Sequence, residues 1–97
     1  MDRRTIASLW EAHSQTQWPQ FSSSNEGQLM TLDTVIGGCV VYYLDGETEL
    51  DPQRVSILED CIVDLDTLLD ELTDDSRMYF ERARQLARLL IEAQQDA

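Results

Sequence analysis

The chain has 97 residues, 42% of them hydrophobic, and its 19 acidic and 7 basic residues give a formal net charge of -12. A chain of this length forms one domain with one modest core, so residues 1–97 are expected to be a single small acidic domain. The negative charge argues against nucleic acids and anionic membrane surfaces as partners, because both are bound chiefly through Lys and Arg.

The first expected element is a helix that begins after Asp2, whose carboxylate can cap the first turn. One face of this helix is apolar with i, i+3, i+4, i+7 spacing, and it consists of Ile6, Leu9, Trp10 and His13. His13 ends that face and is interpreted as a boundary residue, not a catalyst. A loop with Pro19 and a Ser-rich stretch follows, and its Trp18 either plugs the core or binds a partner.

Residues 29–44 are the most apolar part of the chain, and two structures fit them. In a helix, apolar residues recur at three- and four-residue steps, at Leu29, Leu32, Ile36, Cys39 and Tyr43. In a β-hairpin, Gly37 and Gly38 would form the turn. The helix is favoured because its periodicity is longer, and because no third strand is found to support a hairpin. Asn25 is then the expected N-cap, and Gly46 is expected to end the helix in a left-handed conformation.

Small residues gather on the opposite side of this expected helix, at Gly27, Thr31, Thr34 and Gly38. Side chains of this size allow another backbone to approach closely. The approaching backbone belongs either to another helix of this chain or to a second copy of it.

The clearest helix start is the stretch LDPQRV, with Asp51 at the N-cap and Pro52 at the first helical position. A seven-residue apolar repeat follows, at Val55, Leu58, Ile62, Leu65, Leu69 and Leu72. Residues 73–75 are expected to separate this helix from a last one over residues 74–94, and the short connection makes the pair antiparallel. The expected fold is therefore all-α, a four-helix bundle-like domain ending in a long antiparallel helical hairpin. The alternative is α+β, with a β-hairpin at residues 29–44.

Charge is divided between the two helices of that hairpin. The first is acidic, and the residues expected to meet a basic partner are Asp60, Asp64, Asp66, Asp70 and Glu71. The second carries four arginines, of which Arg77, Arg84 and Arg88 lie near one another on helical spacing. These three either pair with the acidic helix, where each exposed pair contributes about 0–1 kcal/mol, or form an anion site.

Residue types that carry catalysis are scarce. Cys39 and Cys61 lie in apolar patterns without CxxC spacing and are expected to be buried free thiols. The single histidine and the absence of a Glu-x-x-His motif argue against a di-metal centre. The loop 45–51 has alternating acids, but its glycine is misplaced for a calcium loop. Neither a metal, nor a cofactor, nor enzymatic activity is expected.

The apolar positions exceed what four helices of this size easily bury, which predicts a non-enzymatic protein-interaction module that self-associates as a dimer. The alternative is an acidic inhibitor of a basic protein, such as an immunity protein, an antitoxin or a nucleic-acid mimic. The N-terminal stretch lacks the apolar core of a signal peptide, and the run from Val35 to Leu44 is too short to span a bilayer. A cytoplasmic location without membrane contact is therefore expected.

Overall fold

The computed structural model describes residues 3–20, 23–46 and 49–95, and within these ranges the chain is helical without a strand. The elements are α1 (Arg3–Gln15), α2 (Glu26–Asp45), α3 (Pro52–Leu68), a 3₁₀ turn η1 (Leu69–Glu71) and α4 (Asp74–Gln95). The all-α prediction is confirmed. The alternative hairpin at residues 29–44 is wrong, because α2 runs without a break through Gly37 and Gly38.

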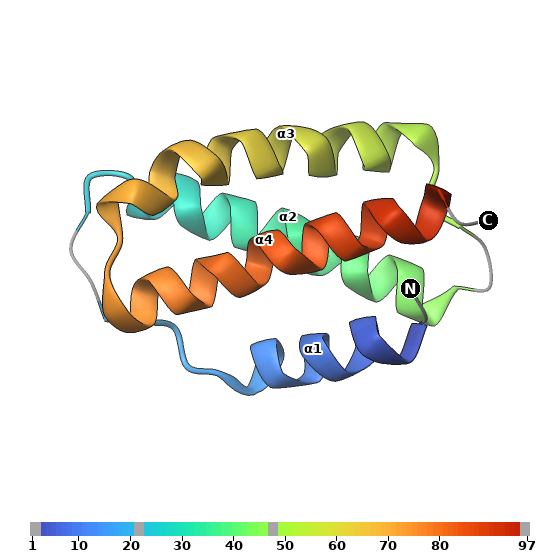
Figure 1. Ribbon diagram of the computed structural model, residues 1–97, viewed down its shortest axis with the longest axis horizontal. Helices are drawn as coiled ribbons and strands as arrows, with labels where there is room; N and C mark the ends of the chain where they lie inside the picture. The colour runs from blue at the N-terminus through green and yellow to red at the C-terminus, as the bar shows by residue number, and fades with distance from the viewer. Residues whose placement is uncertain (1–2, 21–22, 47–48, 96–97) are drawn as a thin grey trace.

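The helices run alternately in opposite directions along the long axis of the molecule (Figure 1). In this view α4 lies in front of α2, and α1 and α3 lie on either side of them. α4 packs against all three other helices, whereas α1 and α3 do not touch within the described ranges. The bundle is therefore flattened, with extents of 39 × 24 × 17 Å, and α2 and α4 meet across its short diagonal. The outer sides of α2 and α4 form its two broad faces.

The core is built from the apolar stripes of all four helices. The largest fully buried side chains are those of Ile6, Leu29, Ile36, Val40, Leu58, Leu65, Leu69, Phe80, Leu86 and Leu90. Burying one such side chain stabilises the fold by about 1.5–3 kcal/mol. Leu50 and Leu72, which flank the ends of the α3 segment, are also buried and anchor the hairpin to this core.

The side chains expected to cap helices make other contacts. The side-chain amide of Asn25 donates hydrogen bonds to the two carboxylate oxygens of Glu71 at 3.0 and 3.1 Å, and no backbone amide of α2 bonds to that side chain. Asp51 has the extended conformation of an N-cap, but its carboxylate accepts a hydrogen bond from Arg54 at 2.7 Å. Both helix starts are confirmed and both capping hydrogen bonds are wrong, because a charged partner is within reach of each side chain. Asp2, the expected cap of α1, lies outside the described residues.

The C-terminus of α2 is closed by an arginine and not by a left-handed glycine. Gly46 is extended, with φ -94° and ψ 162°, so the expected left-handed cap is wrong. Arg3 donates hydrogen bonds to the carbonyl oxygens of Tyr43, Leu44 and Gly46. Its guanidinium also lies 4.6 Å from the ring centroid of Tyr43. A cation suits the negative end of the helix dipole, so α1 stabilises the end of α2.

The turn between the long helices begins earlier than expected. α3 ends at Leu68, and η1 continues the chain to Glu71, whereas the apolar repeat predicts one helix through Leu72. Leu69 and Leu72 stay buried through this tighter turn. Asp74 then adopts φ 52°, a region that aspartate tolerates better than most side chains. The chain can therefore reverse direction within a few residues.

Gly37 and Gly38 differ in their surroundings and form a matched pair for substitution. A Cβ at Gly38 would meet no atom within 4 Å, so Gly38→Ala is expected to raise the free energy of unfolding by about 0.8–1 kcal/mol through helix propensity. A Cβ at Gly37 would lie 3.1 Å from Cη2 of Trp10. Overpacking costs about 1–3 kcal/mol, so Gly37→Ala is expected to be no more stable than the parent chain. Urea denaturation at low protein concentration compares the two, and equal stabilisation by both would contradict this packing.

Candidate functional site

Four polar side chains from α1, α2 and α4 form one hydrogen-bonded cluster inside the bundle. The ring of His13 is 3% exposed, and its Nε2 lies 2.8 Å from Oδ1 of Asp33. The hydroxyl of Tyr79 donates to Oδ2 of the same carboxylate at 2.8 Å. Nε of Arg82 donates to Nδ1 of His13 at 3.0 Å. The cluster therefore ties three helices together, and the interpretation of His13 as a boundary residue is wrong.

The contacts of this cluster fix its protons. Because Nδ1 of His13 accepts a hydrogen bond from Arg82, Nε2 carries the ring proton and donates it to Asp33. Burial, and then the hydrogen bond to Asp33, raise the pKa of Tyr79 above its ordinary value. Within the described ranges, no buried side-chain nitrogen or oxygen lacks a partner. Each group of the cluster is thus engaged within the fold, and we assign it a structural role.

Sequence reasoning does not single out Asp33, Tyr79 or Arg82. One signal was present, since Asp33 is the only charged residue between Glu26 and Asp45 in an otherwise apolar segment. A carboxylate in such a place costs free energy unless it is paired and hydrogen-bonded. The pattern therefore indicates a buried partner, but the partners lie 20 and 46 positions away and no local pattern identifies them.

The outward side of α2 carries no charge between its end residues Glu26 and Asp45, which are both exposed acids. We call the α2 face the uncharged exposed residues on this side, namely Gly27, Met30, Thr31, Thr34, Gly38, Val41 and Tyr42. Their three- and four-residue steps place them on one side of the helix. Met30, Val41 and Tyr42 are 51%, 41% and 42% exposed. A Cβ at Gly27 or Gly38 would meet nothing within 4 Å, so no other described helix of the chain covers this small-residue side.

The two threonines of the α2 face satisfy their own hydroxyl groups. The hydroxyl of Thr31 donates to the carbonyl of Gly27 at 3.0 Å, and that of Thr34 donates to the carbonyl of Met30 at 2.9 Å. Hydroxyls that bond back to the preceding turn do not need water as a hydrogen-bond acceptor. The α2 face can therefore be covered without leaving these donors unpaired, which would cost about 1–3 kcal/mol for each group.

A groove of about 390 Å³ lies between α2 and α3, beside the α2 face. Gly38 and Tyr42 line it from α2, and Arg54 and Ile57 line it from α3. The guanidinium of Arg54 lies 3.9 Å from the ring centroid of Tyr42 and pairs with Asp51 at 2.7 Å. The hydrogen bond from Arg54 lowers the pKa of Asp51. Where the groove meets the α2 face, the charge of Arg54 is balanced by Asp51. Ile57, which is 39% exposed, adds apolar surface to the groove.

The five acids predicted to meet a basic partner do not share one surface. Asp66 accepts a hydrogen bond from Arg84 of α4 at 2.6 Å. Glu71 accepts hydrogen bonds from Asn25 and Ser23, and these lower its pKa. Asp60, Asp64 and Asp70 are exposed. Asp64 and Asp66 are two positions apart and therefore point to different sides of α3.

Trp18 lies at the end of the bundle where the loop after α1 crosses α4. It is half-buried and packs edge-to-face on Tyr79 and Phe80, with 5.5 Å between ring centroids in each pair. Edge-to-face pairs contribute about 0.5–1.5 kcal/mol beyond burial. Trp18 thus plugs this end of the core, and its role in binding a partner stays a prediction.

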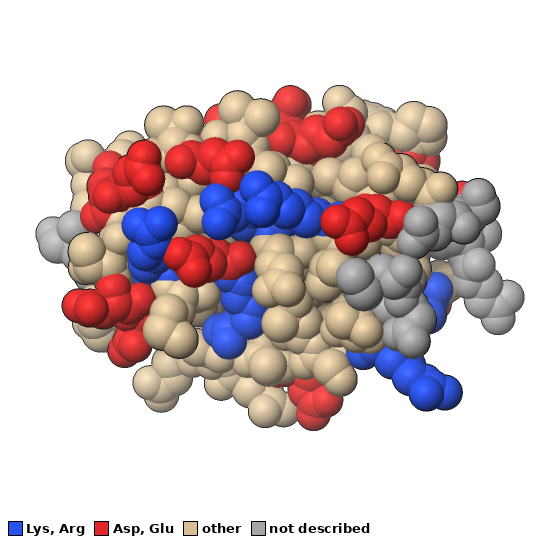
Figure 2. Space-filling view, in the orientation of Figure 1, with Lys and Arg blue, Asp and Glu red and all other residues tan. Residues whose placement is uncertain are grey.

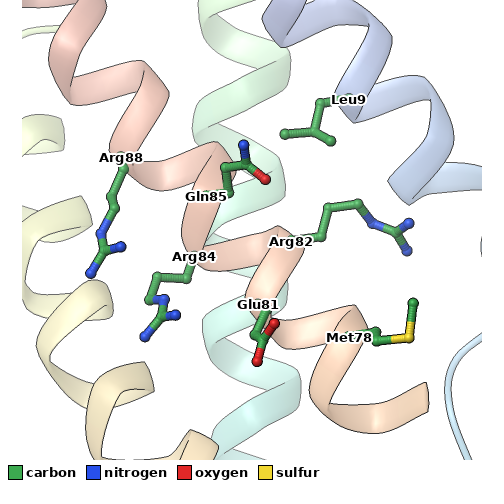
Figure 3. Close-up of a pocket in the computed structure, with 7 residues that line it drawn as sticks. All are labelled: Leu9, Met78, Glu81, Arg82, Arg84, Gln85 and Arg88. Atoms are coloured by element: carbon green, nitrogen blue, oxygen red, sulfur yellow. The ribbon is translucent and has the colours of Figure 1, made fainter. Parts of the chain in front are cut away.

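The three arginines predicted as an anion site are divided by the structure. Arg84 and Arg88 point to the same side of α4 and line a depression of about 540 Å³ (Figure 3). Arg84 pairs with Asp66 at 2.6 Å, and Arg88 lies 3.7 Å from the same carboxylate. Arg77 pairs instead with Glu81 at 2.7 Å and does not line the depression. Pairing with α3, the alternative interpretation, is therefore observed for Arg84 and Arg88.

Cys39 and Cys61 are buried free thiols, as predicted. Burial raises the pKa of Cys39, and it raises the pKa of Cys61 from 9.0 to about 11. The thiolate is the nucleophilic form of cysteine. Both side chains are therefore poor nucleophiles at neutral pH.

These raised pKa values predict a loss of stability in alkali. The unfolded chain ionises Cys61 near pH 9.0, while the folded chain keeps the thiol neutral to about pH 11. The stabilisation is complete below pH 9.0 and is lost as the pH rises toward 11. We expect the urea midpoint to fall between pH 8.5 and 10.5, and to fall less in Cys61→Val, with both proteins kept reduced. An identical decline in the two proteins would contradict burial of an un-ionised Cys61.

No side-chain arrangement in the described ranges brings together three His, Cys, Asp or Glu residues that could hold a metal ion. The loop 45–51, weighed as a calcium loop, includes residues 47–48, which lie outside the described ranges. Within the part of the chain that the structure describes, no helix is both long and apolar enough to cross a bilayer. Comparison with protein-family models, with curated proteins and with solved structures finds no match. The function must therefore be argued from the surfaces themselves.

Proposed function

We propose that this protein is a non-enzymatic interaction module that self-associates as a dimer through the α2 face and the adjoining groove. One observation carries the proposal. In a chain with 19 acidic and 7 basic residues, the exposed side of α2 is uncharged from Gly27 to Tyr42 and is covered by no other described helix.

A second copy of the chain is the occupant that the charges favour. Two molecules that each carry a net charge of -12 repel one another over most orientations. Contact through the α2 face keeps the acids of α3 and α4 away from the centre of the interface, because the exposed residues of α2 from Gly27 to Tyr42 carry no carboxylate and Asp45 lies beyond them at the end of the helix. The same patch on both copies makes an isologous interface, the commonest kind in homodimers.

The dimensions of the α2 face predict a moderate affinity. From Gly27 to Tyr42 the helix is about 23 Å long at 1.5 Å per residue, and a helix is about 10 Å wide. This strip is smaller than the ~800 Å² that each partner buries in a standard interface. The groove with Ile57 therefore has to take part, and a micromolar dissociation constant is expected.

The remaining features are consistent with a binding role in the cytoplasm. His13 is held by Asp33 and Arg82, and both cysteines are buried thiols with raised pKa values. This leaves little for acid–base or nucleophilic catalysis. Free cysteines are typical of a reducing compartment, which supports a cytoplasmic location.

The alternative is an acidic inhibitor that binds a basic protein. Asp60, Asp64 and Asp70 would supply the contact, because they are exposed while Asp66 and Glu71 are engaged within the fold. The two proposals differ in the sign of their salt dependence. Salt screens repulsion between like-charged copies and strengthens the dimer, whereas it weakens attraction to a basic partner.

Light scattering coupled to size exclusion tests the proposal at high micromolar protein concentration. We expect a mass of twice 11.1 kDa, with a dimer fraction that rises as sodium chloride is added. A mass of 11.1 kDa at every salt concentration would refute self-association. In that case, capture of a basic protein from the native lysate would favour the inhibitor proposal if added salt releases that protein.

A further inference from the structure

Arg82 carries a positive charge whose partners, among the described residues, are all neutral. Its Nε donates to Nδ1 of His13 at 3.0 Å, and one of its terminal nitrogens donates to the hydroxyl of Thr16 at 2.9 Å. The ring of Tyr79 lies 6.0 Å from its central carbon. These contacts fix the direction of the guanidinium and leave it without a carboxylate partner in the described ranges. An arginine held in this way is prepared to bind an anionic group.

Two further arginines of α4 point to the other side of the helix from Arg82 and share a single carboxylate (Figure 3). Asp66 pairs with Arg84 at 2.6 Å, and Arg88 is 3.7 Å from the same oxygen. The side chain of Arg88 is 51% exposed, so about half of its surface is open to solvent. Among the described residues, Glu81 is the one acid that lines the depression, and it already pairs with Arg77, while Asp75 lines the neighbouring hollow. Positive charge is therefore in excess here, on a molecule whose net charge is -12.

Figure 2 shows the arginines as blue side chains gathered in the middle of the face formed by α4, with acidic side chains above them, below them and at their right end. The depression has apolar rims, since it is lined by Leu9 and by Met78, which is 68% exposed. Neighbouring hollows share Met78 and Arg82 at one end and Leu9 and Gln85 at the other. We call this continuous surface the α4 groove, lined by Leu9, Met78, Glu81, Arg82, Arg84, Gln85 and Arg88.

We propose that the α4 groove binds an acidic peptide segment of a partner protein that also carries an apolar side chain. Charge complementarity favours carboxylates as partners of Arg82 and Arg88, and the exposed Met78 at one end of the groove would contact the apolar side chain. The distance from Met78 to Arg88 along the helix is about 15 Å, which suits a segment of several residues and exceeds one small anion. This inference does not depend on dimer formation, because it uses the opposite broad face of the bundle.

Fluorescence polarisation with a labelled peptide of about ten residues, rich in Glu and Leu, tests the proposal. Controls are a peptide with Gln in place of Glu and one with Lys in place of Glu. Arg88→Gln and Met78→Ala are each expected to weaken binding several-fold, and Glu81→Gln is expected to tighten it. Ser56→Glu lowers the net charge by the same one unit at an exposed position of α3 and is expected to leave binding within about twofold, since exposed charges away from a contact act weakly.

Circular dichroism of each variant shows that the fold is kept, and comparison of Arg88→Gln with Ser56→Glu separates local contacts from net charge. Saturable binding of the Glu peptide alone, weakened by Arg88→Gln but not by Ser56→Glu, supports the proposal. Failure of the Glu peptide to bind, equal binding of the Gln peptide, or equal weakening by Arg88→Gln and Ser56→Glu would overturn it. The dimer proposal is unaffected by these outcomes, because it is measured without peptide.

Discussion

Replacing Asp33 with alanine is expected to lower the free energy of unfolding by about 2–4 kcal/mol. The side chain accepts hydrogen bonds from both His13 and Tyr79, which are 3% and 7% exposed. Its removal leaves two donors without an acceptor, and each unpaired buried group costs about 1–3 kcal/mol. The Asp33 side chain is 21% exposed, so water can reach part of the space that the carboxylate vacates. The expected loss is therefore smaller than the full cost of two unpaired buried donors.

Urea denaturation at a protein concentration that keeps the chain monomeric measures this loss. Asp60→Ala removes the same charge from an exposed position of α3 and is expected to change stability by less than about 0.5 kcal/mol. Asp33→Asn retains one acceptor and should lie between the two. A loss for Asp33→Ala no larger than that of the Asp60 control would show that the cluster does not hold the helices together.

Introducing a glutamate at Gly38 is expected to weaken the proposed dimer by about 100-fold or more. In an isologous interface each copy brings the new carboxylate, and like charges placed together cost several kcal/mol. The monomer should not suffer, because a Cβ at Gly38 would meet no atom within 4 Å and Glu favours helix over Gly. Sedimentation equilibrium gives the dissociation constant, and thermal unfolding of the dilute protein gives the stability of the fold.

Ala7→Glu is the matched control for Gly38→Glu, because it adds the same charge at an exposed position of α1. It should change the dissociation constant only by the small amount that one extra unit of net charge causes. Gly38→Glu and Ala7→Glu variants with the same dissociation constant would place the contact elsewhere than on the α2 face.

Helix boundaries and core stripes could be predicted because they depend on neighbours in the sequence. The steps Leu29, Leu32, Ile36 and Cys39 repeat with the period of a helix, and all four are buried in α2. The Pro52 start of α3 is equally local. The glycine pair did not break α2, since Gly37 lies close to Trp10 of α1 and tertiary packing outweighs the propensity cost of glycine.

The polar contacts could not be predicted because their partners are distant in sequence. Asn25 and Asp51 occupy positions typical of N-caps, yet Glu71 and Arg54 engage their side chains. His13 is at the end of the apolar face of α1, and no sequence pattern near it indicates that Asp33 and Arg82 are its partners. Contacts that join three helices can be identified only once the packing of the helices is known.

The candidate binding surfaces were predicted in part. The small residues of α2 were recognised from their spacing, but whether another helix of the chain covers them depends on the flattened packing of the bundle. The acidic set stays a prediction, and the structure adds that two of its members, Asp66 and Glu71, accept hydrogen bonds from other side chains of the fold. Arg82 was not singled out, since its importance depends on neutral partners that lie on α1 and beyond its end.

Isotope-filtered nuclear Overhauser spectroscopy on a dimer of one labelled and one unlabelled copy tests the central claim most directly. We predict contacts between copies from the methyl groups of Thr34, Val41 and Ile57, which lie on the α2 face or in its groove. Val63 and Met78, which are 64% and 68% exposed on α3 and α4, should give none. Intermolecular contacts from Val63 or Met78, with none from α2, would contradict the account.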